Sequence, residues 1–208
     1  ITADDLKWNV GNFWAGKTSG GALDITAGTG KSWDLTTLSG AADTVWALAS
    51  STFDVKIKSS LLGEIDYKKL AGNYSVGSIV VSGTSYTADN ASALTIGTPH
   101  AFGGTFSGST TVSSYLPVGA NGGVIASGTV TTSFGTYNCL MIKELITGVY
   151  SREAYYLETV EYGRVATYVK SSSKVWVINA PIQVSTSNLK ASRTLSVFPN
   201  PTNSFINI

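Results

Sequence analysis

At 208 residues the chain is long enough to build one good-sized domain with its own core, so neither disulfides nor a metal are needed to hold it together. Its 14 basic and 13 acidic residues nearly cancel, which argues against nucleic acid or an anionic membrane as a partner, because both attract clustered positive charge. Charged residues make up only 13 % of the chain, and serine, threonine and 22 glycines take their place. This composition is typical of extracellular β proteins and is poor for helices.

The first half of the chain contains irregular strand patterns and one helix candidate. We expect strands near residues 6–10, 22–26 and 44–48, where tryptophans are spread among glycine, serine and threonine. Residues 53–58 alternate apolar and charged side chains, which predicts a strand with one face on a core and one in water. Residues 59–70 are the best candidate for a short helix, because Leu61, Leu62 and Ile65 would share one face.

The second half predicts an antiparallel meander. Residues 78–81 form a β-branched run that can pair with residues 85–87 across a glycine-containing turn. Five strands of a meander are then expected, at residues 124–132, 135–144, 154–162, 164–170 and 174–178. The predicted fold is therefore all-β, an antiparallel meander that forms a strongly curved sheet or half-barrel, with at most one short helix. A two-sheet β-sandwich is the alternative.

Composition also suggests the domain boundaries. We expect a globular all-β domain over residues 1–180, a polar linker over 181–194 that begins as a last strand, and a separate segment over 195–208. The sequence opens at Ile1 with no methionine and no basic segment before an apolar run, so we expect that a signal peptide was removed or the chain was cut. No run of 18 apolar residues occurs, and we therefore expect no transmembrane helix.

The last segment carries the most specific motif. Residues 195–208 run from an apolar strand through Phe198, Pro199, Asn200 and Pro201 into a polar turn and a second apolar run. This pattern resembles the opening of the C-terminal sorting domain of proteins that Bacteroidetes-type bacteria export by type IX secretion. The resemblance implies the type IX export machinery as a partner and a secreted or outer-surface location after signal-peptide removal. The family's domain continues for several tens of residues, whereas this sequence stops at Ile208.

Two shorter stretches resemble uncharacterised cargo domains of the same secretion route. Residues 28–38 are similar to a glycine-then-Trp-Asp segment near the start of many such proteins, and residues 128–137 are similar to their recurrent Gly-Thr-rich hairpin. That hairpin also occurs in the curved half-barrels of bacterial lipoprotein carriers. Ser133 departs from the pattern, which often has proline there. Asp43 and Thr44 fit a short O-glycosylation signal of such bacteria, with Thr44 as the acceptor.

The sequence contains little catalytic chemistry. Cys139, the single cysteine, lies in an alternating run and is expected to be a buried, inert thiol. His100, the single histidine, lies in a loop-like stretch and is expected to be exposed. We therefore predict no catalytic residue, no metal site and no cofactor, although two carboxylates across a cleft would suffice for glycoside hydrolysis. The acids of the meander that could serve are Glu144, Glu153, Glu158 and Glu161.

Aromatic residues are the best functional lead, since the chain has 5 tryptophans and 10 tyrosines. Flat exposed rings on a sheet can stack on sugars, but cross-strand aromatic pairs also stabilise sheets without a ligand. The residues we select as candidate ligand contacts are Tyr155, Tyr156, Tyr168 and Trp176. Exposed coplanar rings would favour a glycan, whereas a groove lined by aliphatic side chains would favour an apolar ligand.

The sequence therefore predicts a secreted or cell-surface, non-catalytic binding or structural module of unknown ligand, exported by type IX secretion. One alternative is a polysaccharide-active enzyme or a carbohydrate-binding accessory module. The other is a module that binds a lipid or another apolar ligand within a curved sheet.

Overall fold

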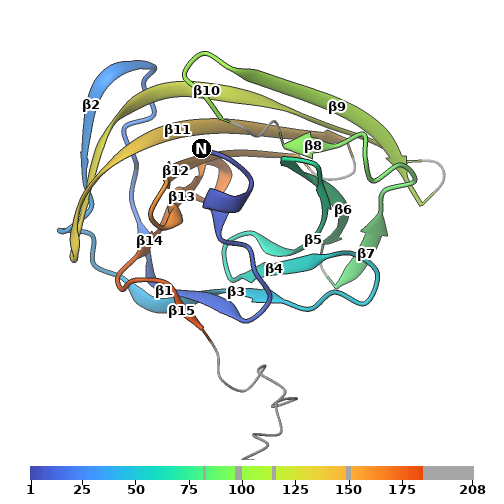
Figure 1. Cartoon of the computed structure of the whole chain (residues 1–208), viewed down its shortest axis with the longest axis horizontal. Coiled ribbons are helices and arrows are strands. Elements are labelled where there is room, and N and C mark those ends of the chain that lie inside the picture. The colour runs from blue at the N-terminus through green and yellow to red at the C-terminus, as the bar shows by residue number, and fades with distance from the viewer. Residues whose placement is uncertain (82, 97–99, 114–115, 149–150, 185–208) are drawn as a thin grey trace, which may run out of the picture.

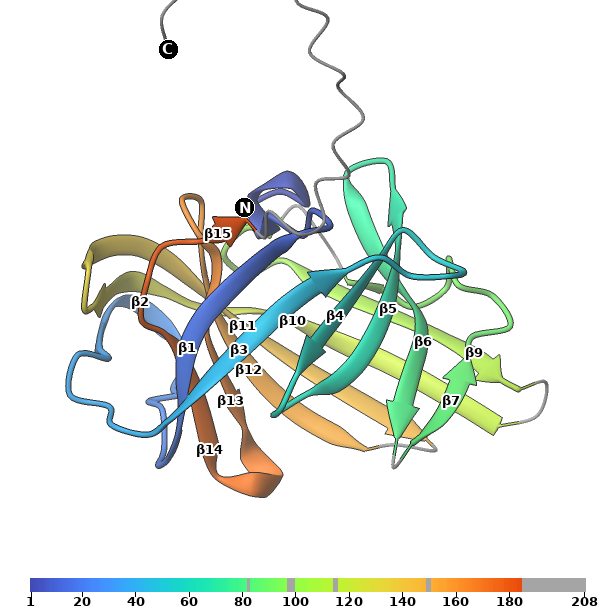
Figure 2. The ribbon, with the colours of Figure 1, turned by 90° about the horizontal axis from the view of Figure 1, so that it is seen from below.

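The protein folds into one large, strongly curved, mixed β-sheet, seen in a computed structural model that describes residues 1–81, 83–96, 100–113, 116–148 and 151–184. Figure 1 shows the sheet curling around a central space, and Figure 2 shows the same wall from below. The only helical elements among these residues are two short 3-10 turns, η1 (Asp4–Leu6) and η2 (Lys170–Ser172). The strands are β1 (Asn12–Gly20), β2 (Gly28–Asp34), β3 (Ala41–Leu48), β4 (Val55–Ser59), β5 (Gly63–Leu70), β6 (Asn73–Val81), β7 (Thr84–Thr87), β8 (Thr95–Ile96), β9 (Thr105–Val112), β10 (Leu116–Thr132), β11 (Gly135–Gly148), β12 (Arg152–Thr159), β13 (Gly163–Val169), β14 (Lys174–Ile178) and β15 (Gln183–Val184).

The strand order defines one continuous sheet whose two ends approach each other. The main path is β2-β10-β11-β12-β13-β14-β1-β3-β4-β5-β6-β7, and β9, β8 and β15 pair with β10, β6 and β1 respectively. The curl brings the two ends of the sheet together, because Ala88, just after β7, forms an isolated antiparallel bridge with Val112 of β9. The sheet is therefore a half-barrel, and among the described residues its two edges are joined by one isolated β-bridge rather than by a continuous run of paired residues. The all-β, strongly curved fold predicted from the sequence is confirmed.

Most of the predicted hairpins are present. The long hairpin over residues 124–144 is β10–β11, and the five-strand antiparallel meander from β10 to β14 is confirmed. The pairing of residues 78–81 with 85–87 is confirmed as β6–β7, and residues 44–48 lie in β3. The strand expected at the start of residues 181–194 is β15, whereas the domain boundaries themselves stay predictions.

Residues 59–70 were expected to be helical, and this prediction is wrong. The chain reverses direction there, because Gly63 takes a φ of 75°, a left-handed conformation that favours glycine. The backbone N–H of Leu62 donates to the Ser59 hydroxyl and closes the turn, and Ile65 then pairs with Ile57 across β4–β5. The apolar residues that suggested one helix face are thus divided between a turn and a buried strand.

The strands expected at residues 6–10 and 22–26 are also absent. Lys7 adopts a left-handed φ of 57° after η1, which interrupts any extended run, and Trp8 then turns into the core. In the second stretch, the Asp24 carboxylate accepts hydrogen bonds from the backbone and hydroxyl of Thr26, a local turn that competes with sheet formation.

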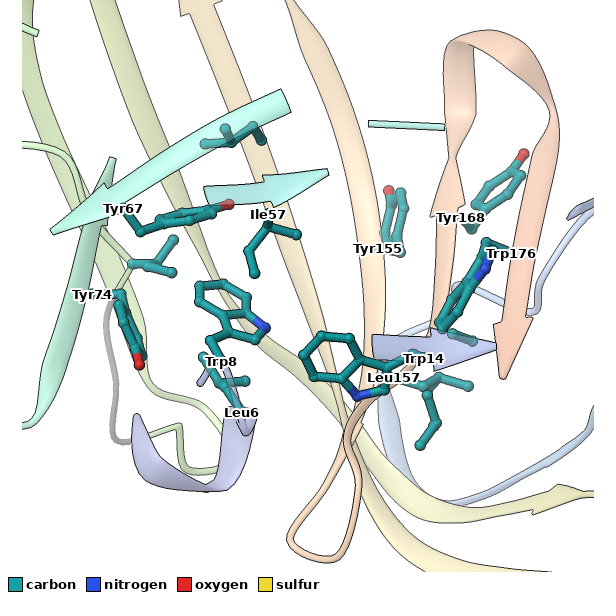
Figure 3. Close-up of a cluster of buried hydrophobic side chains, with 14 of the residues drawn as sticks. Leu6, Trp8, Trp14, Ile57, Tyr67, Tyr74, Tyr155, Leu157, Tyr168 and Trp176 are labelled. Carbon is teal, nitrogen blue, oxygen red and sulfur yellow. The ribbon is translucent and has the colours of Figure 1, made fainter. Parts of the chain in front are cut away.

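The N-terminal segment lies across one end of the curved sheet (Figures 1 and 2). Leu6 is fully buried, and a Cβ at Gly163 would come within 2.6 Å of the Leu6 carbonyl oxygen, so η1 packs directly on the start of β13. The Trp8 ring contacts Tyr67 and Tyr74 with centroid separations of 4.5 and 5.0 Å. Figure 3 shows this aromatic group reaching toward Trp14. The segment therefore fills part of the space that the sheet encloses.

Candidate functional site

The inner face of the meander carries the most distinctive group of side chains. Tyr156 of β12 is the register partner of Thr167 of β13, which in turn pairs with Trp176 of β14. Cross-strand partners point to the same face of a sheet, so these three side chains form a row. A β-bulge in β13 adds Arg164 to this face, because Glu158 pairs with Arg164 while its neighbour Leu157 pairs with Ala166, which leaves Val165 unpaired.

A cavity lies on this inner face, over the neighbouring strands β13, β14, β1, β3 and β4. It is narrow, with a free internal volume of about 20 Å³, and it opens to solvent at its mouth. The loop between β4 and β5 contributes Leu61 and Leu62 to its wall. Most of the lining is apolar or aromatic, and Arg164 is the one charged side chain in it. The lining residues are Trp8, Trp14, Val45, Ile57, Ser59, Leu61, Leu62, Arg164, Thr167 and Trp176.

Gly16 of β1 makes room for one wall of this cavity. A Cβ at that position would lie 2.5 Å from the Val177 carbonyl oxygen and 2.6 Å from the indole ring of Trp176, both far inside contact distance. The glycine therefore lets the Trp176 ring pack directly against β1. In that position Trp176 is 98 % buried, yet its indole N–H has no hydrogen-bond partner among the described residues.

A buried ion network borders the cavity. Glu158 is fully buried and accepts hydrogen bonds from Arg164, at 3.3 Å from Nε and 3.1 Å from Nη2. Its second oxygen lies 2.9 Å from Nδ1 of His100. Burial alone would raise the pKa of Glu158, but the hydrogen bond and charge of His100 and the charge of Arg164 outweigh it and hold the pKa below its usual value.

A second buried pair continues the network along the same face. Glu144 of β11 accepts hydrogen bonds from Arg152 Nη2 at 2.6 Å and from the Tyr156 hydroxyl at 2.7 Å. Burial opposes ionisation of Glu144, but the Arg152 charge and the Tyr156 hydrogen bond lower its pKa overall. Arg164 joins the two pairs, since its guanidinium carbon lies 3.5 Å from the centre of the Tyr156 ring.

This arrangement suits binding better than acid–base catalysis. A glycoside hydrolase needs one carboxylic acid with a raised pKa as a proton donor, whereas both buried glutamates here are held ionised by arginines. Glu153 is on the surface, where hydrogen bonds from Tyr155, Lys170 and Lys143 lower its pKa to about 2. Glu161 is exposed in the turn between β12 and β13. The four acids of the meander therefore do not form an acid and base pair, and no cluster of metal-binding side chains occurs in the described parts of the chain.

The structure corrects the expectation for His100. The loop-like sequence around it predicted exposure, but the side chain is buried and contacts Glu158. The backbone explains the difference, because the His100 N–H donates to the Ile1 carbonyl and ties this segment to the N-terminal one. Cys139 behaves as predicted: it is buried, and burial raises the pKa of its thiol to about 12.

The four candidate ligand residues divide between two faces of the sheet. Tyr156 and Trp176 lie on the inner face, and Trp176 lines the cavity. Tyr155 and Tyr168 pair with each other on the opposite face, with ring centres 6.1 Å apart. Figure 3 labels Trp176 and both tyrosines, which belong to neighbouring strands but point to opposite faces of the sheet. All four side chains are at least 93 % buried, so they do not make an exposed platform, and their role as ligand contacts stays a prediction.

The predicted glycosylation site and the sorting motif stay predictions. Thr44 is half-buried in β3, where it pairs with Ala15, and its glycosylation stays a prediction. The sorting motif at residues 198–201 lies outside the described residues. Of the tryptophans, only Trp46 is partly exposed, and it stacks on Phe13 with centroids 4.8 Å apart.

Sequence reasoning missed several residues that build the cavity. Trp8 precedes β1, Trp14 lies in β1, and Arg164 and Thr167 lie in β13, so no shared motif marks them in the sequence. The sequence of β12 does carry one sign of the buried network. Alternation along this strand places Arg152, Ala154, Tyr156 and Glu158 on one face. Two charged residues and a tyrosine on one face of a buried strand predict an internal polar network.

Comparisons with known proteins identify no family. No family model matches the chain, and no curated protein matches it significantly. Two solved structures match the chain, each with a TM-score of 0.37. One is described as a proposed lipoprotein from Parabacteroides distasonis, 11 % identical, with 85 % of this chain and 96 % of that chain covered. The other is described as a proposed exported protein with a YmcC-like fold from Bacteroides fragilis, 10 % identical, with 84 % and 96 % covered. Among the described residues, no helix is long and apolar enough to cross a membrane.

Proposed function

We propose that the protein is a secreted or cell-surface, non-catalytic module that binds a small apolar or amphiphilic ligand inside its curved sheet. The observation that carries this proposal is the cavity with three tryptophans and four aliphatic side chains in its wall. Ligand sites are typically concave and mostly apolar, with a few polar groups that orient the ligand. The inner face therefore supports an apolar ligand better than a glycan platform, because four of the five tryptophans are buried.

The cavity as it stands is narrow, and the loop that carries Leu61 and Leu62 forms part of its wall. Both leucines are only partly buried, and they lie in a turn between β4 and β5 rather than in the ladder itself. A ligand chain would therefore enter by spreading this turn rather than by opening the sheet. Ring and chain burial would drive binding, at roughly 0.8 kcal/mol for each methylene group removed from water.

Tryptophan fluorescence tests the proposal directly, since Trp8, Trp14 and Trp176 line the cavity. We expect decanol, a neutral ten-carbon alcohol, to change the emission in a saturable manner below its solubility limit. Val45→Phe adds bulk to the cavity wall and should weaken this response at least tenfold. Val10→Phe is the matched control, because Val10 is 47 % exposed and does not line the cavity. Equal decanol binding by both variants, or no saturable response in the wild type, would contradict the proposal.

The export route is a separate part of the proposal. The motif of Phe198, Pro199, Asn200 and Pro201 supports type IX secretion through its resemblance to sorting domains. In a bacterium with that machinery, the natural full-length protein carrying Pro199→Ala and Pro201→Ala should accumulate in the periplasm. Unchanged appearance outside the cell would argue against this route.

A further inference from the structure

The cavity has one polar wall among its apolar ones, and this wall consists of hydrogen-bond donors. Arg164, Thr167 and Trp176 lie there, on neighbouring strands β13 and β14. Arg164 uses Nε and Nη2 to hold Glu158, while its Nη1 makes no hydrogen bond among the described residues. The indole N–H of Trp176 is likewise unpartnered, although the residue is 98 % buried. Buried polar groups are nearly always hydrogen-bonded in native proteins, so an unpartnered donor in a residue that lines a cavity is a candidate contact for an acceptor from outside the chain.

The fold fixes the guanidinium of Arg164 in place. Glu158 holds one side of it, the Tyr156 ring lies 3.5 Å from its central carbon, and the Trp8 ring lies 5.2 Å away. Its side chain is 13 % exposed, which leaves part of the planar group open toward the cavity. A planar guanidinium with a free N–H is well suited to a carboxylate oxygen.

The charges of the lining agree with this assignment. Arg164 is the one charged residue among the ten that line the cavity, and none of the ten is acidic. The Ser59 hydroxyl already accepts a hydrogen bond from the Leu62 backbone, so the lining offers the ligand mainly donors. A cationic head group would be repelled by Arg164, and no acidic side chain in the lining would offset this repulsion. A carboxylate head group would instead accept hydrogen bonds from the donors.

We infer that the cavity selects a carboxylate amphiphile, such as a medium-chain fatty acid, whose head accepts hydrogen bonds from Arg164 and Trp176 and whose chain contacts Trp8, Trp14 and Leu62. This inference rests on the proposed function, because it names the ligand class for the same cavity. The donors set which head is bound, and the aromatic and aliphatic walls hold the chain. Tyr156 and Glu158 act as positioning residues for Arg164.

The test compares three ligands with the same ten-carbon chain: decanoate, decanol and decyltrimethylammonium, titrated at pH 8 and followed by tryptophan fluorescence and calorimetry. We expect the wild type to bind decanoate about tenfold more tightly than decanol, since a hydrogen bond to a charged group typically contributes about that factor. The cationic ligand should bind most weakly. Decanol binding as tight as decanoate binding would overturn the inference while leaving the proposed function intact, and failure of all three ligands would overturn both.

A pair of tryptophan variants locates the donor. Trp176→Phe keeps a ring in the wall but removes the indole N–H, so it should weaken decanoate binding about tenfold and change decanol binding less than twofold. Trp46→Phe is the matched control, because Trp46 does not line the cavity, and it should change neither affinity. An equal loss for decanoate and decanol in Trp176→Phe would show a packing effect and refute a role in head recognition. Calorimetry reads both variants independently of the fluorescence change that each substitution causes.

Discussion

Replacing Glu158 by glutamine tests whether the buried ion network stabilises the fold. The carboxylate is fully buried and accepts hydrogen bonds from Arg164 and lies within hydrogen-bond distance of His100. Glutamine keeps the shape but removes the charge, and its amide nitrogen faces groups that are themselves donors. Removing one partner of a buried ion pair typically costs about 3–5 kcal/mol, because the remaining charge is left uncompensated. Since the glutamine oxygen can still accept one hydrogen bond, we expect a loss near the lower end, about 3 kcal/mol.

Urea unfolding at pH 7.5, followed by far-UV circular dichroism, measures this loss. With a slope of roughly 3 kcal/mol per molar urea, the midpoint should fall by about 1 M. Glu161→Gln is the matched control, since the same change is made three residues later in an exposed turn, and it should alter the unfolding free energy by less than about 0.5 kcal/mol. A loss below about 1 kcal/mol for Glu158→Gln would refute the view that this network contributes to stability.

Three further predictions concern pH, packing and the two faces of the sheet. The pKa of Glu158 is lowered in the folded state, so its ionisation stabilises the fold fully above the ordinary pKa of 4.5, and this stabilisation is lost as pH falls through the folded-state pKa. The urea midpoint should therefore decrease below pH 4.5, and the decrease should be smaller in Glu158→Gln. Gly16→Ala should lower the unfolding free energy by about 1–3 kcal/mol and change the emission of Trp176, because its Cβ would overlap that indole; a wild-type melting temperature would contradict the packing described. Tyr155→Phe should leave decanoate affinity unchanged within twofold, as its side chain lies on the face opposite the cavity, whereas a large loss in calorimetry would place the ligand on that outer face.

The parts of the sheet in which consecutive strands pair with each other could be predicted from the sequence. Alternating strands joined by short glycine-containing turns fix the β6–β7 and β10–β11 hairpins and the meander, because each strand pairs with the next one along the chain. The parallel pairing of β2 with β10 joins segments about one hundred residues apart, and no local pattern signals it. The same holds for Trp8, whose burial depends on rings from β5 and β6 rather than on its own neighbours.

The candidate site was harder to predict for a geometric reason. Arg164 and Thr167 are three residues apart, so regular alternation would place them on opposite faces of β13. The bulge at Val165 turns Arg164 back to the inner face, where it meets Glu158 and Tyr156. Sequence reasoning selected Tyr155, Tyr156 and Tyr168 together as candidate ligand contacts. Successive residues of a strand point to opposite faces, and of these three only Tyr156 is on the side of the cavity.

The buried ion network and the cavity are best understood together. A core built for stability alone would place apolar side chains at Glu158 and Arg164, since well-packed apolar replacements of a buried ion pair are often as stable or more stable. The joint replacement Glu158→Leu with Arg164→Met removes both members of this ion pair, but it leaves the buried His100 without its partner at Glu158. We therefore expect this double variant to be about 1–3 kcal/mol less stable than the wild type, which is the usual cost of one buried polar group left unpaired. It should still bind decanol but lose its preference for decanoate, because the Arg164 donor is gone while the apolar walls remain. A double variant that retained the decanoate preference would show that the network serves the fold alone.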